Sequence, residues 1–152
     1  MISEVSKKAI LELWARRPVG ISYPQASEAD LVDFEGIHGK IPDDFRWFLK
    51  HCGSGVIGSE WIDGIDDLYS SHSKFHSETK IPNGWKTSEL FIIGWDGSGN
   101  PIGLMPDGQV VVEDHNFGGV HRLSETLEDF ILTGITDKEK SQSEQGVDGN
   151  PH

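Results

Sequence analysis

The residues best suited to ligand chemistry lie in a glycine-rich segment, residues 94–101 (GWDGSGNP), between two apolar runs. Asp96, Ser98 and Asn100 would occupy the first, third and fifth positions of a calcium-binding loop. The sixth position of such a loop is a glycine that makes its sharp turn, but this chain has Pro101 there. A phosphate-binding loop needs a helix directly after its glycines, whereas a strand pattern follows here. The segment is therefore interpreted as a turn between two strands.

A second glycine pattern, residues 53–58 (GSGVIG), matches the G-x-G-x-x-G spacing of dinucleotide-binding loops. Such a loop follows a strand and opens a helix, so that its backbone amides converge on a pyrophosphate. In this chain the pattern follows a predicted helix and precedes a predicted strand. It is interpreted as a loop that ends a helix.

Four histidines raise the possibility of a bound metal. His72 and His76 are four residues apart, which places them on one face if their segment is helical, and His115 and His121 could approach from a sheet. No cysteine or carboxylate completes an obvious ligand set around them. We predict neither a metal nor another cofactor, and a metal-dependent enzyme using these histidines remains an alternative.

Side chains that could act as nucleophiles or as acid–base pairs do not form a recognisable catalytic set. No G-x-S-x-G turn exposes a serine, and Cys52, at the end of an aromatic-rich helix, is interpreted as a small core residue. Asp66 and Asp67, like Glu113 and Asp114, are adjacent carboxylates, which would point to opposite faces of a strand. The sequence therefore predicts a protein without enzymatic activity.

Several tryptophans lie in loop-type sequence beside acidic residues. Large aromatic side chains next to charges are typical of binding surfaces, although the same rings could also cover the edges of a core. The predicted partner-binding residues are Trp61, Asp63, Asp66, Asp67, Trp95 and Asp96.

The chain is strongly acidic, with 13 Lys and Arg against 25 Asp and Glu, a net charge of −12. This charge disfavours nucleic acid and anionic membranes as partners and favours a cationic protein, although acidity could also serve solubility alone. One cysteine excludes an internal disulfide, and no apolar run approaches the roughly 20 residues of a membrane span. We therefore predict a cytoplasmic protein.

Apolar spacing and turn residues outline the elements that must position these side chains. Helices are predicted over residues 3–17, from Ser27 as N-cap, from Pro42 to about His51 with Gly53 just after it, and over residues 123–132 with Ser124 as cap. Strands are predicted within residues 56–65 and at residues 90–95, 102–105 and 109–113, and residues 66–78 form a short helix or a loop. This order predicts an α+β fold with a single, mostly antiparallel sheet flanked by helices. Residues 1–134 are predicted to form one domain, and residues 135–152 a disordered polar tail.

Three of these segments together resemble the SUKH superfamily, which includes yeast regulators of cell-wall synthesis and bacterial immunity proteins. They are residues 41–49 (IPDDFRWFL), residues 90–94 (LFIIG) with the glycine-rich turn that follows, and residues 123–132 (LSETLEDFIL). The resemblance covers roughly residues 27–132. It implies an α+β domain with helices around one sheet, and a role in binding rather than catalysis.

The resemblance further implies a cytoplasmic immunity protein that binds and neutralises a cognate bacterial toxin domain, such as a nuclease, by blocking its active cleft. The acidic composition suits that role, because the cleft of a nuclease is usually positive. The protein is expected to act as a monomer or weak homodimer, without nucleic-acid or membrane partners. The alternative from the regulator branch is an intracellular scaffold that binds an endogenous partner.

Overall fold

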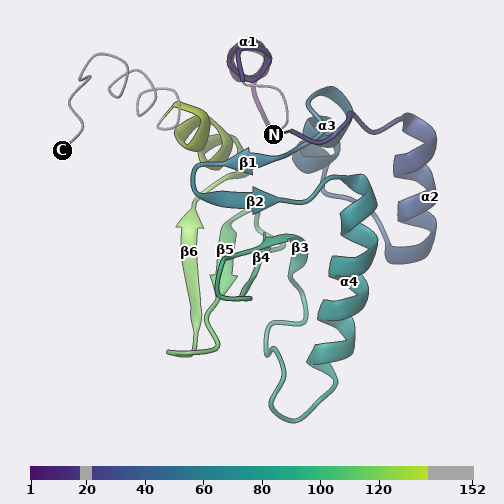
Figure 1. The fold of residues 1–152 in the computed structure, drawn as a ribbon, viewed down its shortest axis with the longest axis vertical. Helices are drawn as coiled ribbons and strands as arrows, with labels where there is room; N and C mark the ends of the chain where they lie inside the picture. Colours follow the sequence, from purple (N-terminus) through teal and green to yellow (C-terminus); the bar gives the residue numbers. More distant parts are fainter. Residues whose placement is uncertain (18–21, 137–152) are drawn as a thin grey trace, which may run out of the picture.

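Helices and a single antiparallel sheet make up the fold, which confirms the predicted α+β class (Figure 1). The computed structural model describes residues 1–17 and 22–136. The helices are α1 (Glu4–Ala15), α2 (Glu28–His38), α3 (Asp43–His51), α4 (Ile65–Thr79) and a last helix at residues 127–136. No helix within these described ranges is both long enough and apolar enough to cross a bilayer.

Strands that follow one another in the chain are also neighbours in the sheet, whose order among the described residues is β1-β2-β3-β4-β5-β6, antiparallel throughout. Their bounds are β1 (Val56–Ile57), β2 (Glu60–Ile62), β3 (Phe91–Trp95), β4 (Pro101–Leu104), β5 (Val110–Glu113) and β6 (Val120–Ser124). In Figure 1, β1 and β2 run across the view whereas β6 runs along its vertical axis, so the sheet twists strongly between its edges. The helix α4 connects β2 to β3 and lies beside α2.

The second helix begins where the sequence predicts. The Ser27 side chain accepts a hydrogen bond from the backbone of Asp30, and the Asp30 carboxylate accepts one from the backbone of Ser27, which makes a capping box. Leu31 and Phe34 are fully buried, whereas Ile37, which follows them at helical spacing, is 70% exposed. Six helical residues turn the chain through about 600°, so Ile37 is rotated by about 120° from Leu31 and faces solvent.

The loop after α3 confirms the interpretation of the second glycine pattern. The backbone N–H of Gly53 donates to the Phe48 carbonyl at 3.0 Å, and its φ of 90° is the left-handed conformation that ends many helices. A Cβ atom at this position would lie 2.2 Å from the Tyr23 carbonyl oxygen. Only glycine therefore fits here, and its function is to turn the chain from α3 into β1.

The segment predicted as a short helix or a loop is the 15-residue helix α4. Its buried side chains include Leu68, Ser71, His72 and Phe75, which follow the spacing of one helical face. Two of these four are polar, which hid the apolar periodicity in the sequence. The helix was recognisable only from its packing against α2 and β3.

The predicted helix at residues 123–132 is wrong at its start, because Leu123 and Ser124 belong to β6, which pairs with β5. The helix instead begins at residue 127, and its cap is Thr126, whose hydroxyl accepts a hydrogen bond from the Asp129 backbone at 3.1 Å. It continues to residue 136, so Ile135, just past the predicted domain boundary, is buried. Residues 137–152 of the predicted tail lie outside the described residues.

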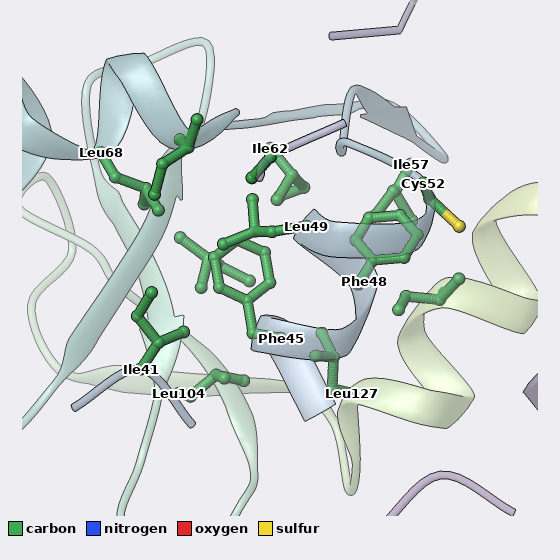
Figure 2. Packing of buried hydrophobic residues seen from close by; sticks show 14 of the residues in the cluster. Ile41, Phe45, Phe48, Leu49, Cys52, Ile57, Ile62, Leu68, Leu104 and Leu127 are labelled. Atoms are coloured by element: carbon green, nitrogen blue, oxygen red, sulfur yellow. The ribbon is translucent and has the colours of Figure 1, made fainter. Parts of the chain in front are cut away.

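The core is centred on α3, whose Phe45, Phe48 and Leu49 are fully buried. Figure 2 shows these side chains between Leu68 of α4 and Leu127 of the last helix, which come from opposite sides of the core. Cys52 lies in the same cluster, as predicted, and its burial raises the pKa of its thiol to about 12. The core thus joins the sheet to helices from both halves of the chain.

Candidate functional site

Four of the six predicted binding residues come from the short segment that joins the sheet to α4. Trp61 lies in β2, Asp63 follows that strand, and Asp66 and Asp67 lie in the first turn of α4. Figure 1 shows β2 ending where α4 begins, so these residues lie at the junction between the sheet and this helix. The two aspartates also suit the positive end of the helix dipole.

Trp95, the fifth predicted residue, lies directly opposite Trp61 on the neighbouring strand β3. Residues opposite each other in an antiparallel pair point to the same face of the sheet. Trp61 is 54% exposed, whereas Trp95 is half-buried and its indole N–H donates to the Ser71 hydroxyl at 3.0 Å. Trp61 is therefore available to a partner, while Trp95 is held against α4.

Asp63 is a half-buried carboxylate that accepts a hydrogen bond from the Ser71 hydroxyl at 2.5 Å. Burial raises the pKa of Asp63 to about 6, the bond from Ser71 opposes this rise, and the charge of Asp67 adds to it. Ser71 thus links Asp63 to Trp95. The carboxylate is ionised at neutral pH but close to its titration range.

Tyr23 completes this region from a distant part of the chain. Its ring centre lies 6.4 Å from that of Trp61, in an edge-on arrangement. Burial raises the pKa of the Tyr23 hydroxyl, and the nearby charges of Asp67 and Asp63, together with a hydrogen bond to Asp67, raise it further. The neutral Tyr23 hydroxyl therefore donates to the Asp67 carboxylate and orients it.

Asp96, the sixth predicted residue, has its carboxylate occupied by the turn between β3 and β4. It accepts hydrogen bonds from the backbone N–H groups of Ser98 at 2.9 Å and Asn100 at 2.8 Å, and from the Asn100 side chain at 3.0 Å. Burial alone would raise the pKa of Asp96, but these hydrogen bonds outweigh it and lower the pKa. The glycine-rich segment is therefore a turn stabilised by its own aspartate, as the sequence indicated.

The exposed tryptophan and its surrounding carboxylates form one surface, which we call the Trp61 patch and define as Tyr23, Trp61, Asp63, Asp66 and Asp67. Asp66 and Asp67 are exposed. Within the described ranges no Lys or Arg forms an ion pair with any of the three aspartates. The patch therefore combines a large apolar side chain with negative charge that the described part of the chain leaves uncompensated.

A comparison with protein families accounts for this fold. The model of the SMI1 / KNR4 family (SUKH-1) matches residues 25–133. The chain belongs to this family. No curated protein matches the chain. The family match confirms the SUKH resemblance and includes the patch except for Tyr23, which precedes the matched residues.

The four histidines considered as metal ligands lie in different surroundings in this SUKH-1 protein. His72 and His76 do lie on one face of α4, with ring centres 6.0 Å apart, but His72 is buried and its Nε2 donates to the Ile92 carbonyl at 2.9 Å. Burial lowers the pKa of His72 to about 4. His115 instead contacts Trp85, and His121 lies in β6. Among the described residues, no three His, Cys, Asp or Glu side chains are arranged to hold a metal ion.

The two pairs of adjacent carboxylates in this family member lie in different settings. Asp66 and Asp67 lie on a helix rather than on a strand, and both are exposed. Glu113 is buried. Its Oε2 accepts a hydrogen bond from the backbone N–H of Lys86 at 2.9 Å, and its Oε1 accepts one from the backbone N–H of Thr87, also at 2.9 Å. Its carboxylate fixes the segment before β3 against the sheet.

Tyr23 and Ser71 belong to the site but were not identified from the SUKH-1 sequence. Tyr23 is 38 positions before Trp61 and lies in a segment without periodicity. Ser71 resembles an ordinary polar residue of a surface helix. Only the packing of α4 against β3 reveals that its hydroxyl bridges Asp63 and Trp95.

Proposed function

We propose that this SUKH-1 protein acts by binding another protein, and that its partner is a cognate bacterial toxin domain whose active cleft it covers. The observation that carries the proposal is the Trp61 patch, in which an indole that is 54% exposed packs edge-on against Tyr23, which in turn lies beside the carboxylates of Asp63 and Asp67. Tryptophan is among the residues most often dominant in binding free energy. A cationic cleft would complement the surrounding carboxylates.

The charge of the patch favours a partner of opposite sign. Asp63 and Asp67 accept hydrogen bonds from hydroxyl groups, of Ser71 and Tyr23 respectively, rather than from a cationic side chain. The remaining acidic residues of the chain, with its net charge of −12, add a long-range field of the same sign. A toxin that acts on nucleic acid needs a positive cleft to bind phosphate. The patch would occupy that cleft in place of the substrate.

The function is tested by producing the chain together with the toxin domains encoded beside its gene. The expected result is survival of the host and co-purification of one toxin with the chain. The variant Trp61→Ala is expected to weaken binding by more than about 2 kcal/mol, which is roughly thirtyfold or more in Kd, as for other central aromatic residues. Phe117→Ala is the matched control, because Phe117 is 89% exposed and lies outside the patch.

The charge is tested by the double variant Asp66→Asn with Asp67→Asn. Its association with the toxin is expected to be slower, and the difference from the native chain should shrink at high salt. Asp33→Asn is the control, because Asp33 is exposed on α2. Survival equal to that of an empty vector with every neighbouring toxin would refute the toxin proposal. Capture of an endogenous partner through the same Trp61 would instead favour a regulatory scaffold.

A further inference from the structure

A cavity of about 530 Å³ lies between the second half of α4, residues 81–86 and the loop that follows β5. No residue of the Trp61 patch lines it. Its volume is within the range of small-molecule sites, which are about 300–1,000 Å³. It is therefore a second surface feature, and the class of its ligand follows from the chemistry of its own walls.

Trp85 and His115 form the aromatic wall of this cavity, and their rings meet edge to face with centres 5.9 Å apart. The indole N–H of Trp85 donates to the Glu78 carboxylate at 2.5 Å, which holds the ring in place. The ring of Trp95 lies 6.1 Å from that of Trp85, and the Lys74 ammonium lies 4.4 Å from the centre of the Trp95 ring. The faces of tryptophan rings attract cations, and one ring of this cluster already contacts one.

His115 offers this cavity a hydrogen-bond acceptor. The Asn100 side chain, on a residue that is 4% exposed, donates to Asp96, so its amide oxygen faces His115. That oxygen accepts the backbone N–H of His115 at 2.9 Å and also contacts Nδ1 of the ring. Because an amide oxygen only accepts, Nδ1 carries the proton, and Nε2 of the neutral ring is an acceptor. No residue that the structure describes donates to Nε2.

Two carboxylates of the wall each have one oxygen without a donor. Glu78 accepts the Trp85 N–H on Oε2, and Asp114 accepts two backbone N–H groups of the following turn on Oδ1. Within the described part of the chain, nothing donates to Oε1 of Glu78 or to Oδ2 of Asp114. The third carboxylate, Glu113, accepts from the backbone of residues 86–87 through both oxygens. The partners of all three carboxylates are neutral, so their charge is not compensated by these contacts.

The two lysines of the wall do not pair with these carboxylates. Lys74 and Lys86 are both exposed, and neither takes part in an ion pair among the described residues. Three carboxylates against two lysines leave the wall negatively charged when His115 is neutral. The net charge of the chain, −12, adds a field of the same sign. The wall therefore favours a ligand that is cationic and donates hydrogen bonds.

We propose that this cavity binds a guanidinium group, carried either by a small organic cation or by an arginine side chain. Its flat face stacks on the Trp85 ring, and its N–H groups donate to Glu78, Asp114 and His115. A guanidinium has its five N–H donors in one plane and stacks on aromatic rings, whereas an ammonium has three donors and cannot stack. Three acceptors next to an aromatic ring therefore suit a guanidinium better than an ammonium.

The test is an NMR titration of the full chain that follows the indole N–H resonance of Trp85, which is assigned with the variant Trp85→Phe. Butylguanidine, butylamine and butylurea share an alkyl group and differ in their head groups, which are a guanidinium, an ammonium and a neutral planar urea. Butylguanidine is expected to shift the Trp85 resonance with a Kd of about 1–10 mM, because it is a very small ligand. Butylurea should bind at least about fivefold more weakly, because the charge is lost. Butylamine should also bind more weakly than butylguanidine.

A further compound distinguishes the two sources of the guanidinium group. In N-acetylarginine amide this group is carried by an arginine side chain between two peptide groups. Tighter binding of this compound than of butylguanidine identifies an arginine of another protein as the ligand. Equal or weaker binding identifies a small free cation.

Variants of the wall test the sign of the ligand charge. Asp114→Asn keeps the oxygen that accepts from the turn but loses the charge, so it should weaken butylguanidine binding at least about threefold. Lys86→Gln removes a positive charge from the wall and should tighten the binding. Asp33→Asn, the same charge change as Asp114→Asn but exposed on α2, should leave it unchanged. A thermal melt checks that each variant is folded, and Glu78→Gln replaces Asp114→Asn if the latter is not.

Four results would overturn the proposal. They are an unshifted Trp85 resonance at about 20 mM butylguanidine, equal binding of butylurea and butylguanidine, full affinity of the folded carboxylate variant, and weaker binding by folded Lys86→Gln. Because no toxin is present and Trp61 does not line the cavity, these outcomes are independent of the proposed function.

Discussion

Replacing Asp63 by asparagine is expected to stabilise the chain at neutral pH, although Asp63 accepts a hydrogen bond. Asparagine has the same shape and keeps an oxygen that can accept from Ser71, but it carries no charge. Burial raises the pKa of Asp63 from 3.8 to about 6. Each pKa unit corresponds to about 1.4 kcal/mol, so about two units correspond to about 3 kcal/mol. Asp63 is only half-buried, so solvent screens part of this electrostatic cost. We therefore expect the variant to gain about 2 kcal/mol in free energy of unfolding.

The pH dependence of this gain has a definite sign. Between pH 3.8 and about 6, Asp63 is ionised in the unfolded chain but protonated in the folded chain. The folded chain then binds more protons, so its stability falls as the pH rises through this window. Below this pH window Asp63 does not lower the free energy of unfolding, and above the window it lowers it by the full amount. His72, whose pKa burial lowers to about 4, acts in the opposite direction, but it is the same in both proteins and cancels in their difference.

The measurement is urea unfolding of the native chain and of Asp63→Asn at several pH values from 4 to 8. The difference in free energy of unfolding should be near zero at pH 4 and reach about 2 kcal/mol above pH 7. Asp33→Asn, on the exposed face of α2, serves as the control. A difference that is constant across this pH range, or a loss of stability at pH 7.5, would show that the carboxylate of Asp63 is not held in an unfavourable ionised state.

Two further substitutions test how the sheet and its loops are held. Glu113→Gln keeps one acceptor oxygen but loses the negative charge that binds the backbone N–H groups of Lys86 and Thr87. The variant should lose about 1–3 kcal/mol in free energy of unfolding, measured in urea, and its hydrogen exchange at these two amides should be faster. Gly53→Ala places a Cβ atom 2.2 Å from the Tyr23 carbonyl at a φ of 90°; it should cost more than about 2 kcal/mol, seen as a thermal shift of at least several degrees. Gly36→Ala is its control, since nothing lies within 4 Å of a Cβ atom there, and a Gly53→Ala chain as stable as this control would contradict the assigned turn.

Elements with a strong local signal were predictable. The Ser27 cap, the Pro42 start of α3 and the glycine turn after it depend on contacts within a few residues, and each lies where predicted. The strands β3, β4 and β5 agree with their predictions to within one residue at each end. Their turns contain residues whose conformational preferences act locally.

Elements stabilised by distant partners were harder to predict. The strand β6 consists of exposed or half-buried residues without alternation, and it exists because it pairs with β5. Leu123 and Ser124 fit the pattern of a helix start equally well, and this strand pairing decides against it. The helix α4 was ambiguous for a related reason, since Ser71 and His72 are polar yet buried against β3 and α2.

The sequence alone determined the acidity of the protein, its local turns and caps, and its resemblance to the SUKH proteins, because these depend on composition and on neighbouring residues. It also indicated that Trp61 and the aspartates after it could form a binding surface. The tertiary structure decided which of these residues are exposed to a binding partner. It brought Tyr23 to Trp61 and joined Asp63 and Trp95 through Ser71. The physical reason is that exposure, charge pairing and pKa depend on atoms that are close in space but distant in the chain.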